Sequence, residues 1–469
     1  MRLRMLLLAV LVAVPAIAAT PFDDSFIDKT MRVDYFHTST PKGDEIIALD
    51  KVVSDGPWPG SRTYLVDRSN LGKYLFEVID RDTNSVIFSR GFASVYGEWE
   101  TTSDAKERAG TYHESLRFPW PKKPVQVVLK KRDAAQAFQQ VWSTLIDPKS
   151  RFVNPADIKP AGRVWSVFEN GPASQKVDLL LIGEGYTDAE MPKLKKDMER
   201  LVARLFATEP FKSHKSDFNV RVLELPATKS GVHRPRTGDN RRTPTGVQYN
   251  IFDSERYVLT MDNAAMRDIA SSAPYDFLEI VVNEKQYGGG GIYGDQATTS
   301  VDSGSSEYVF VHEFGHHFAG LADEYYTSDV AYETGGAEHP EPWEPNITAS
   351  GAHPKWFDMV TPGTPLPTPW DKKAFEDHAK EYQAERRRIR ESNAPESEMD
   401  KLFAREKEWS TKFLAQFGGK VGAFEGAGYE AKGLYRPEAD CIMFTRDDVG
   451  FCDVCSRAIV RVIEMYSAK

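Results

Sequence analysis

The sequence is short of three things: long apolar runs, positive charge and cysteine. After the N-terminus no apolar run approaches the ~20 residues of a membrane-spanning helix, so we expect no membrane span. Lys and Arg number 59 against 69 Asp and Glu, and the formal charge of -10 argues against general affinity for nucleic acid or anionic lipid. The three cysteines allow at most one disulfide, which would leave one thiol over.

The N-terminus has the composition of a cleavable secretory signal. Arg2 and Arg4 precede a short apolar run from Met5 to Val14, and small residues follow up to Ala19. Because the run is too short to span a bilayer, we predict a signal peptide over residues 1–19 rather than a membrane anchor. The protein is then exported, either secreted or periplasmic, and losing both arginines takes its formal charge from -10 to -12.

The three cysteines, Cys441, Cys452 and Cys455, lie close together near the C-terminus. In an oxidising compartment we expect a disulfide between Cys441 and either Cys452 or Cys455. The alternative is a structural metal site that a distant histidine completes. The disulfide is favoured because an exported chain lacks the reducing conditions that keep thiolates free.

The chain is too long for one ordinary core, so we expect two or three domains. From residue 31 to about residue 131, apolar residues alternate with their neighbours, and this predicts an all-β, sandwich-like domain over residues 20–145. His37 and His113 stand alone in it, which is typical of packing or surface histidines, and we assign no chemistry there. The alternating residues are Val33 and Tyr35; Tyr74, Phe76 and Val78; Tyr112, Glu114 and Leu116; and Val125, Val127 and Leu129.

A polar stretch with several prolines, residues 146–163, is expected to be a linker, and the pattern changes after it. Three apolar strands follow, with a helix between the first and the second. A Thr-x-x-Glu capping box, Thr187 to Glu190, opens that helix. This order predicts a mixed α/β (α+β) domain over residues 164–469. The strands are residues 177–182, 218–225 and 277–282.

Two segments of this second domain have an unusual composition. Four glycines, Gly288 to Gly291, are not followed by the Lys-Ser/Thr of a phosphate loop, so we expect a flexible rim beside a cleft. Residues 327–440 are rich in Pro, Gly and charge, and we expect a largely helical insertion. Within it, residues 371–417 look helical with a break near Pro395, as in a solvated helical hairpin.

The residues that carry chemistry lie in one helical window, residues 305–326. His312 and His316 are four residues apart, so both imidazoles lie on one face and can reach a single Zn²⁺ at ~2.0–2.1 Å. Glu313 is one step round from His312 and can take a proton from a water at the metal. The buried side of this helix is expected to consist of Phe310, Phe314, Phe318 and Leu321.

A catalytic zinc site needs three protein ligands and one open position, so a third ligand must follow. In metzincins the pattern is His-Glu-x-x-His-x-x-Gly-x-x-His or Asp, in which the glycine turns the chain back to present the last ligand. Gly320 comes one residue later than this pattern allows, but Asp323 keeps the Gly-x-x-ligand spacing. We therefore predict Asp323 as the third ligand, with Glu324 as the alternative. His317 faces away from the two ligands and is expected to be structural.

Metzincins also place a Met turn beneath the metal and then a terminal helix, and Met443 fits that role. With these residues, the chain over roughly 170–469 resembles the IgA peptidase family of metallopeptidases. The resemblance implies a metzincin-like zinc endopeptidase, often with a β-rich N-terminal domain, but it does not identify immunoglobulin A as the substrate. The segments that carry the resemblance are Gly183 to Tyr186, His312 to Tyr325, Gly422 to Tyr429, Gly433 to Glu438 and Cys441 to Met443.

One position departs from the wider group. In its astacin-like members a tyrosine follows the methionine by two residues, whereas this chain has Thr445 there. A tyrosine that contacts the transition state would have to come from elsewhere, and Tyr429 and Tyr435 are weak substitutes.

The hypothesis is therefore a secreted zinc endopeptidase that acts on a protein or peptide substrate. His312, His316 and Asp323 hold Zn²⁺, and Glu313 activates the attacking water. One alternative is a gluzincin-like peptidase whose third ligand is a glutamate on a later helix, with Asp323 as a cap or salt-bridge residue. Another is a non-catalytic binding protein that keeps the fold, although intact Glu313 argues against it.

Overall fold

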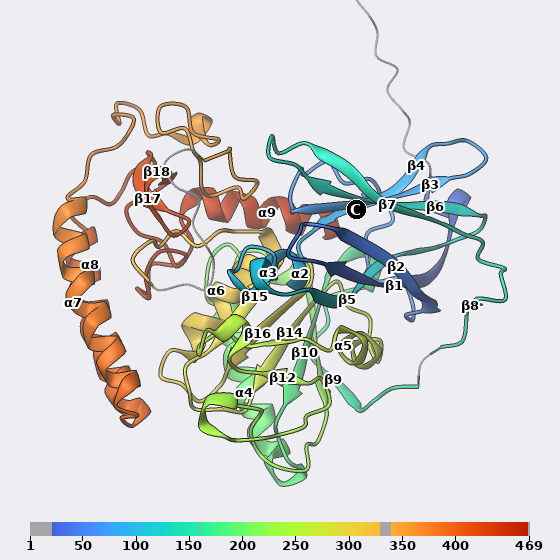
Figure 1. Ribbon diagram of the computed structural model, residues 1–469, viewed down its shortest axis with the longest axis horizontal. Helices are drawn as coiled ribbons and strands as arrows, with labels where there is room; N and C mark the ends of the chain where they lie inside the picture. Colours follow the sequence, from blue (N-terminus) through green and yellow to red (C-terminus); the bar gives the residue numbers. More distant parts are fainter. Residues whose placement is uncertain (1–20, 158, 329–338, 468–469) are drawn as a thin grey trace, which may run out of the picture.

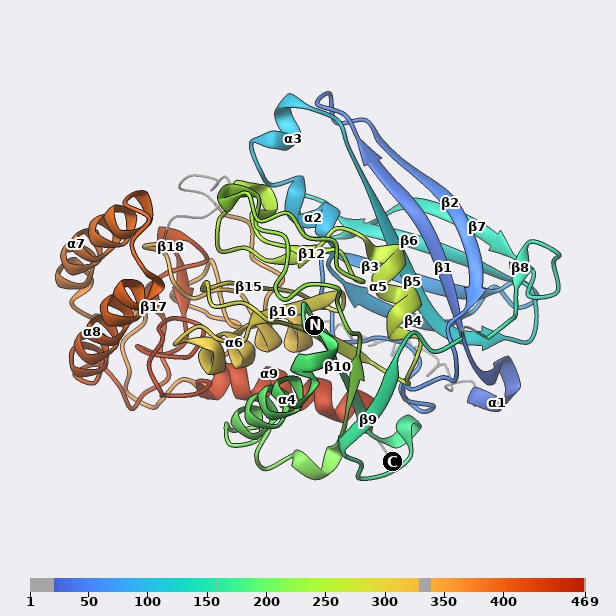
Figure 2. The same cartoon turned by 90° about the horizontal axis from the view of Figure 1, so that it is seen from below.

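The computed structural model describes residues 21–157, 159–328 and 339–467 (Figure 1). The predicted signal peptide, residues 1–19, lies outside these ranges, as do residues 329–338 of the predicted insertion. The described chain forms a β-rich N-terminal part, a central sheet with its helices, and a pair of helices at one side of the molecule (Figures 1 and 2). Among these residues, no helix is both long enough and apolar enough to cross a membrane.

Two four-stranded sheets enclose one apolar core in the N-terminal part. One sheet has the order β5 (Gly110–Pro121), β1 (Phe26–Ser39), β2 (Glu45–Ser54) and β8 (Val153–Asn154). The other has the order β4 (Val86–Phe92), β3 (Tyr74–Asp80), β6 (Val125–Arg132) and β7 (Phe138–Ile146). The short helices are α1 (Phe22–Ser25), α2 (Val95–Trp99) and α3 (Asp104–Glu107).

The core of these sheets is built from the alternation in the sequence. Val33, Phe76, Leu116 and Val127 are all buried, and they come from β1, β3, β5 and β6 respectively. Since successive side chains of a strand point to opposite faces, one face of each strand can pack inwards while the other meets water. The segment predicted as a linker contains β8, which pairs with β2.

A six-stranded sheet forms the centre of the second part. Its order is β15 (Gly289–Ile292), β16 (Gln296–Ser300), β14 (Phe277–Val282), β10 (Val177–Glu184), β11 (Phe218–Glu224) and β9 (Arg163–Phe168). The four inner strands run parallel, and both edge strands are antiparallel to their neighbours. The predicted mixed α/β architecture is confirmed, and β10, β11 and β14 match the three predicted strands to within two residues.

Both faces of this sheet are covered, and every residue of its four inner strands is buried. One face packs against α4 (Met191–Leu205), α6 (Ser306–Ala319) and α9 (Asp453–Ser467). The other packs against α5 (Asn263–Ala270) and the small ribbon of β12 (Val247–Gln248) and β13 (Leu259–Thr260). The predicted capping box is present ahead of α4, where the Thr187 N–H donates to Glu190 at 2.9 Å.

The glycine run was predicted to be a flexible rim beside a cleft: it does border the cleft described below, but Gly289–Ile292 is the edge strand β15 and not a loop. The strand lies directly against α6, so its glycines have a packing role. A Cβ atom at Gly291 would stand 2.3 Å from the Glu313 carbonyl oxygen and 2.9 Å from the His316 Cβ. Only glycine lets the strand approach the helix this closely.

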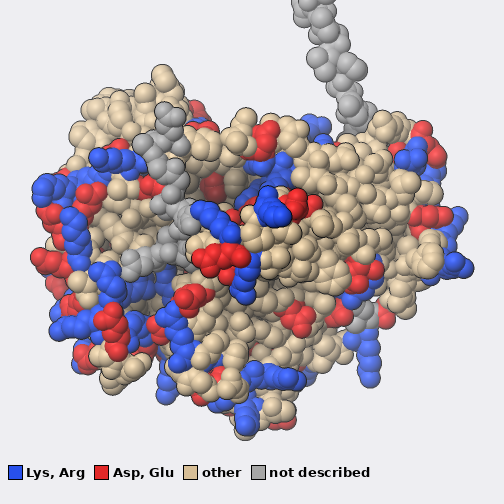
Figure 3. All heavy atoms as spheres, in the orientation of Figure 1, with Lys and Arg blue, Asp and Glu red and all other residues tan. Residues whose placement is uncertain are grey.

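The predicted helical hairpin is present as α7 (Lys372–Glu391) and α8 (Glu396–Leu414), with the break at 392–395. Acidic and basic side chains are interspersed over its surface (Figure 3, left). The predicted insertion, 327–440, is not largely helical: its other described residues, 327–328, 339–371 and 415–440, are mainly irregular. They contain the hairpin of β17 (Phe424–Ala427) and β18 (Glu430–Arg436).

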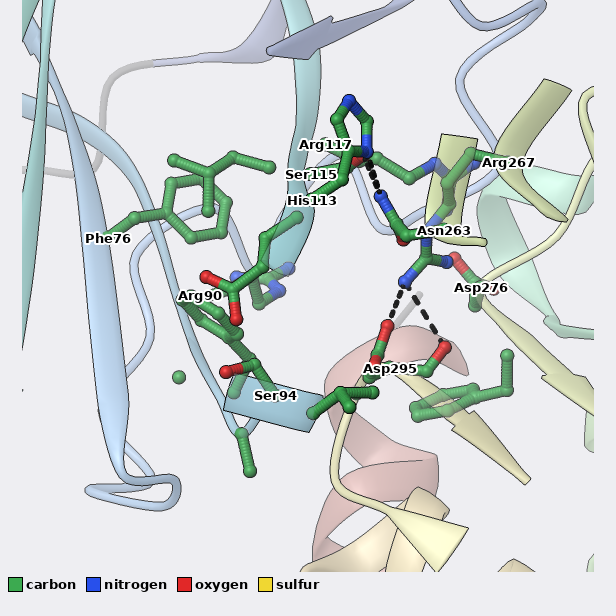
Figure 4. Close-up of a pocket in the computed structure, with 18 of the residues that line it drawn as sticks. Phe76, Arg90, Ser94, His113, Ser115, Arg117, Asn263, Arg267, Asp276 and Asp295 are labelled. Carbon is green, nitrogen blue, oxygen red and sulfur yellow. Dashed lines mark hydrogen bonds and ion pairs between the residues drawn. The ribbon is translucent and has the colours of Figure 1, made fainter. Parts of the chain in front are cut away.

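A cavity of about 100 Å³ lies where the N-terminal sheets meet the central part (Figure 4). Charged groups around it already have partners: Arg267 pairs with Asp295 at 2.6 Å, and Arg117 pairs with Asp55 at 2.7 Å. Asn263 of α5 also donates to His113 of β5 at 3.0 Å. We interpret the cavity as part of a polar interface that holds the two parts together.

His37, which the sequence left without a role, is a buried structural residue. Its two ring nitrogens lie 3.0 Å from Glu114 and 2.7 Å from Glu45, and its ring stacks on Tyr96 at 3.6 Å. Burial would lower the pKa of His37, but the hydrogen bonds and charges of Glu114 and Glu45 raise it to about 8.

This shift predicts a pH-dependent contribution to stability. Because His37 binds its proton more tightly in the folded chain than in the unfolded one, the contribution is complete below about pH 6.5 and is lost as the pH rises through about 8. The difference corresponds to about 2 kcal/mol. We expect His37→Gln to flatten the fall in thermal midpoint between pH 6 and pH 9, whereas the exposed-site control His353→Gln should retain it. An unchanged pH profile in His37→Gln would contradict this role.

Candidate metal centre

Helix α6 carries the first two candidate ligands and ends in a sharp turn. Phe310, Phe314 and Phe318 are fully buried, as the helical spacing predicted. Gly320 then adopts a left-handed conformation with φ +61°, and its N–H donates to the His316 carbonyl at 3.0 Å. A Cβ atom at this position would stand 2.7 Å from the Trp343 ring, so the turn requires glycine for conformation and for space.

The turn brings Asp323 back against the two histidines. The distance from Asp323 Oδ1 is 3.0 Å to His312 Nε2 and 3.2 Å to His316 Nε2, and the two Nε2 atoms are 3.1 Å apart. Ligands at ~2.0–2.1 Å on the corners of a tetrahedron lie about 3.3 Å from one another. The spacing of the three atoms therefore fits one zinc-sized ion.

The hydrogen bonds of the two Nδ1 atoms determine whether the two Nε2 atoms can bind a cation. His312 Nδ1 lies 2.9 Å from the Ile442 carbonyl oxygen, and His316 Nδ1 lies 2.5 Å from that of Leu321. A carbonyl can only accept, so both Nδ1 atoms carry a hydrogen, and in the neutral rings both Nε2 atoms then present lone pairs. When both rings are neutral, two lone pairs and a carboxylate oxygen face one point, which is the donor set of a cation site. Burial would lower the pKa of His316, but Asp323 raises it to about 9, so an ion that binds here displaces a proton from His316.

The two acidic residues after the turn point in different directions. Asp323 faces the histidines, and its second oxygen accepts a hydrogen bond from the Tyr429 hydroxyl. Burial would raise the pKa of Asp323, but His316 and His312 hold it well below its usual value. Glu324 instead contacts Asn346 at 3.0 Å and Cys455 at 3.3 Å. Of these two candidates for a third ligand, only Asp323 meets both histidines.

Glu313 lies beside the two histidines and faces the cleft. One carboxylate oxygen of Glu313 and one nitrogen from each of His312 and His316 lie within 4.8 Å of one another. Burial raises the pKa of Glu313, and the charges of the two histidines oppose that effect. His317 points the other way, as expected, because its Nδ1 donates to the Ile292 carbonyl and its Nε2 accepts from the Leu278 N–H.

The predicted Met turn lies directly beneath α6. Met443 is fully buried, and a Cβ atom at Gly315 would stand 3.2 Å from its sulfur. The Met443 carbonyl accepts the Glu324 N–H at 2.8 Å. Thr445 bonds to Asp440, away from the histidines. Of the two tyrosine substitutes, Tyr429 reaches the centre, whereas Tyr435 pairs with Thr348.

The candidate centre opens into a cleft of about 570 Å³ whose walls come from distant parts of the chain. The edge strand β15 forms one wall, and Arg256 and Tyr325 form another, with Arg256 Nη2 3.4 Å from the Tyr325 hydroxyl. The N-terminal part also contributes, through residues that include Gly97 and Arg132. The sequence analysis gave no role to Arg256 or Tyr325. Tyr325 lies next to the motif, whereas Arg256 lies in an irregular loop whose sequence shows no recognisable pattern.

The predicted disulfide is not formed in the structure. Cys441, Cys452 and Cys455 are all free and buried. The sulfur atoms of Cys441 and Cys455 are 3.9 Å apart, far from the ~2.05 Å of a covalent bond. The cysteines instead gather around Glu324.

Comparison with known proteins identifies both parts of the chain. Residues 166–463 match the family model described as IgA Peptidase M64, and residues 21–143 match the model described as Peptidase M64 N-terminus. A comparison with curated proteins found no significant match. The first model covers well over half of the chain, including every residue of the candidate centre. The chain therefore belongs to the M64 family of IgA peptidases, and it is a peptidase.

Proposed function

We propose that this peptidase is an exported, zinc-dependent, metzincin-like endopeptidase with His312, His316 and Asp323 as its metal ligands. The observation that carries the proposal is the convergence of two imidazole lone pairs and one carboxylate oxygen within 3.2 Å of one another. A neutral hydrogen-bonded cluster would need donors between these atoms, and both imidazole hydrogens are directed at backbone carbonyls instead. The left-handed turn at Gly320 supports the metzincin-like assignment.

The mechanism assigns separate roles to the residues of the chain. Zn²⁺ held by the three ligands would supply a Lewis acid that lowers the pKa of a water and polarises a peptide carbonyl. Glu313 takes the proton of the attacking water and passes it to the leaving amine. The water attacks the carbonyl carbon, the carbon–nitrogen bond breaks, and a carboxylic acid and an amine are the products.

Two further residues position this machinery. Tyr429 donates to the outer oxygen of Asp323, which leaves the inner oxygen for the metal. Arg256 lines the cleft beside Tyr325, so the positive charge lies close to where a negative oxygen develops during attack. We assign Tyr429 a positioning role and Arg256 an electrostatic one.

The edge strand supports an extended peptide as the substrate. β15 pairs with β16 on one side, and on the other side Gly289 pairs with residues 256–258. Gly289 and Gly291 line the cleft next to Glu313, and the edge beyond Gly289 borders that cleft. A strand edge offers backbone N–H and C=O groups to a peptide that lies alongside it. The N-terminal part borders the same cleft, so we infer that it contributes to substrate selection.

The two alternatives are less well supported. A distant glutamate as third ligand would make Asp323 a salt-bridge residue, but its carboxylate lies 3.0 and 3.2 Å from the two Nε2 atoms that this metal would need. A non-catalytic binding protein would not need Glu313 in the cleft next to the histidines, and the family is a peptidase family.

Glu313→Gln is expected to separate catalysis from metal binding. The change removes the proton acceptor but no metal ligand, so hydrolysis of casein should fall by about 10²–10⁴-fold while bound zinc stays at the wild-type amount. Casein turnover and zinc content measured on the same preparation test this. Activity within tenfold of wild type would show that Glu313 is not the base.

Asp323→Ala and Glu324→Ala are expected to differ in what they do to the catalytic metal. Asp323→Ala, like the positive control His316→Ala, should lower zinc affinity at this centre by orders of magnitude and abolish casein hydrolysis. Glu324→Ala should mainly lower stability and leave activity recoverable at saturating zinc. Zinc titration of activity in the chelated protein distinguishes the two. Full recovery by Asp323→Ala, with none by Glu324→Ala, would reverse the assignment.

A further inference from the structure

A second group of metal-binding side chains lies behind the catalytic centre. Cys441, Cys452, Cys455 and Glu324 are fully or almost fully buried, and each has a ligand atom within 4.8 Å of the others. Cys455 Sγ lies 3.9 Å from Cys441 Sγ and 3.3 Å from Glu324 Oε1. No step of the proposed mechanism uses these residues.

The local backbone is arranged to stabilise thiolates. The N–H groups of Met443 and Cys452 point at the sulfur of Cys441 at 3.5 and 3.3 Å. The N–H of Cys455 points at the sulfur of Cys452 at 3.4 Å. Cys452 and Cys455 also stand at the N-terminus of α9, whose dipole favours negative charge. A Cys-x-x-Cys pair with such hydrogen bonds is a common half of a tetrahedral metal site.

Glu324 provides an independent sign that a cation belongs there. Its side chain is 0% exposed, one oxygen accepts from Asn346 at 3.0 Å, and the other, Oε2, has no hydrogen-bond partner. A buried carboxylate oxygen without a partner is costly, and the thiols around it are weak donors. A cation in the middle of the group would offset the charge of this buried carboxylate.

We propose that Cys441, Cys452, Cys455 and Glu324 form a second, closed zinc site. Zn²⁺ at ~2.3 Å from sulfur and ~2.1 Å from oxygen sets sulfurs about 3.8 Å apart and a sulfur about 3.6 Å from the oxygen. The observed 3.9 and 3.3 Å agree with these values. All four positions are filled by protein and the group is buried, so the site is structural and not catalytic.

A bound metal ion would involve more of these four side chains than a disulfide would. A disulfide would join two sulfurs and leave the third thiol and the unpartnered Glu324 oxygen as they are. A four-coordinate ion uses all three sulfurs and the carboxylate. Thiolates bound to zinc are also less available for oxidation, so the site is compatible with an exported protein.

A metal ion at the second site would link the segments that support the proposed catalytic centre. Glu324 is the neighbour of Asp323, and its N–H donates to the Met443 carbonyl at 2.8 Å. Cys441 begins the same turn, in which the Ile442 carbonyl accepts from His312. An ion that holds Glu324 and Cys441 therefore fixes the backbone on both sides of the catalytic histidines.

The test measures metal in a protein whose catalytic centre has been removed. Wild type should hold two zinc ions per chain, His316→Ala one, Cys455→Ser one, and the double variant none. The control Ser456→Ala, one residue further along α9, should hold two. Cobalt-substituted His316→Ala should show a thiolate-to-cobalt charge-transfer band in the near ultraviolet that is absent from Cys455→Ser.

Three results would overturn the second site. His316→Ala could bind no metal, or its cobalt form could lack the thiolate band. Alkylation of denatured, unreduced protein could also find one free thiol instead of three, which would show a disulfide. Glu324→Gln keeps the shape of the side chain, so it can replace Cys455→Ser in these measurements if Cys455→Ser does not fold. Glu324→Gln should shift the cobalt bands. None of these readouts depends on peptidase activity, so failure here leaves the catalytic proposal standing.

Discussion

The left-handed turn at Gly320 is the constraint on which the candidate centre depends. It ends α6 immediately after His316, places the Leu321 carbonyl on His316 Nδ1, and returns Asp323 to within 3.0 and 3.2 Å of the two Nε2 atoms. A side chain at Gly320 would strain the backbone and meet Trp343. One backbone conformation therefore sets the tautomer of one ligand and the position of another, and this explains why one extra helical residue before the glycine is tolerated.

Residues near the C-terminus support the rest of the candidate centre. The Ile442 carbonyl fixes the tautomer of His312, and Met443 packs against α6 while its carbonyl binds the Glu324 N–H. The cysteine group continues this support to the start of α9. The residues of the candidate centre thus depend on a layer of backbone contacts from segments more than a hundred residues away. Such contacts orient ligands before a metal arrives, which lowers the free-energy cost of forming the site.

The part of this arrangement that could be predicted from the sequence is the part governed by local periodicity. His312, Glu313 and His316 follow from helical spacing, Asp323 from the glycine turn, and the strands and the hairpin of α7 and α8 from apolar and charged patterns. Long-range packing could not be read in the same way. The glycine run is an edge strand that lies against α6, Arg256 reaches the cleft from an irregular loop, and the three cysteines lie around Glu324, which is distant in sequence.

In the proposed centre, one zinc ion is held by His312, His316 and Asp323 at the base of a cleft shared by both parts of the chain. The most direct measurement is a crystal structure of the protein purified with its metal, with anomalous diffraction recorded on both sides of the zinc absorption edge. We expect an anomalous peak ~2.0–2.2 Å from both Nε2 atoms and from an Asp323 oxygen. A peak bound by Glu324 with Asp323 turned away, or no zinc beside the two histidines, would contradict it.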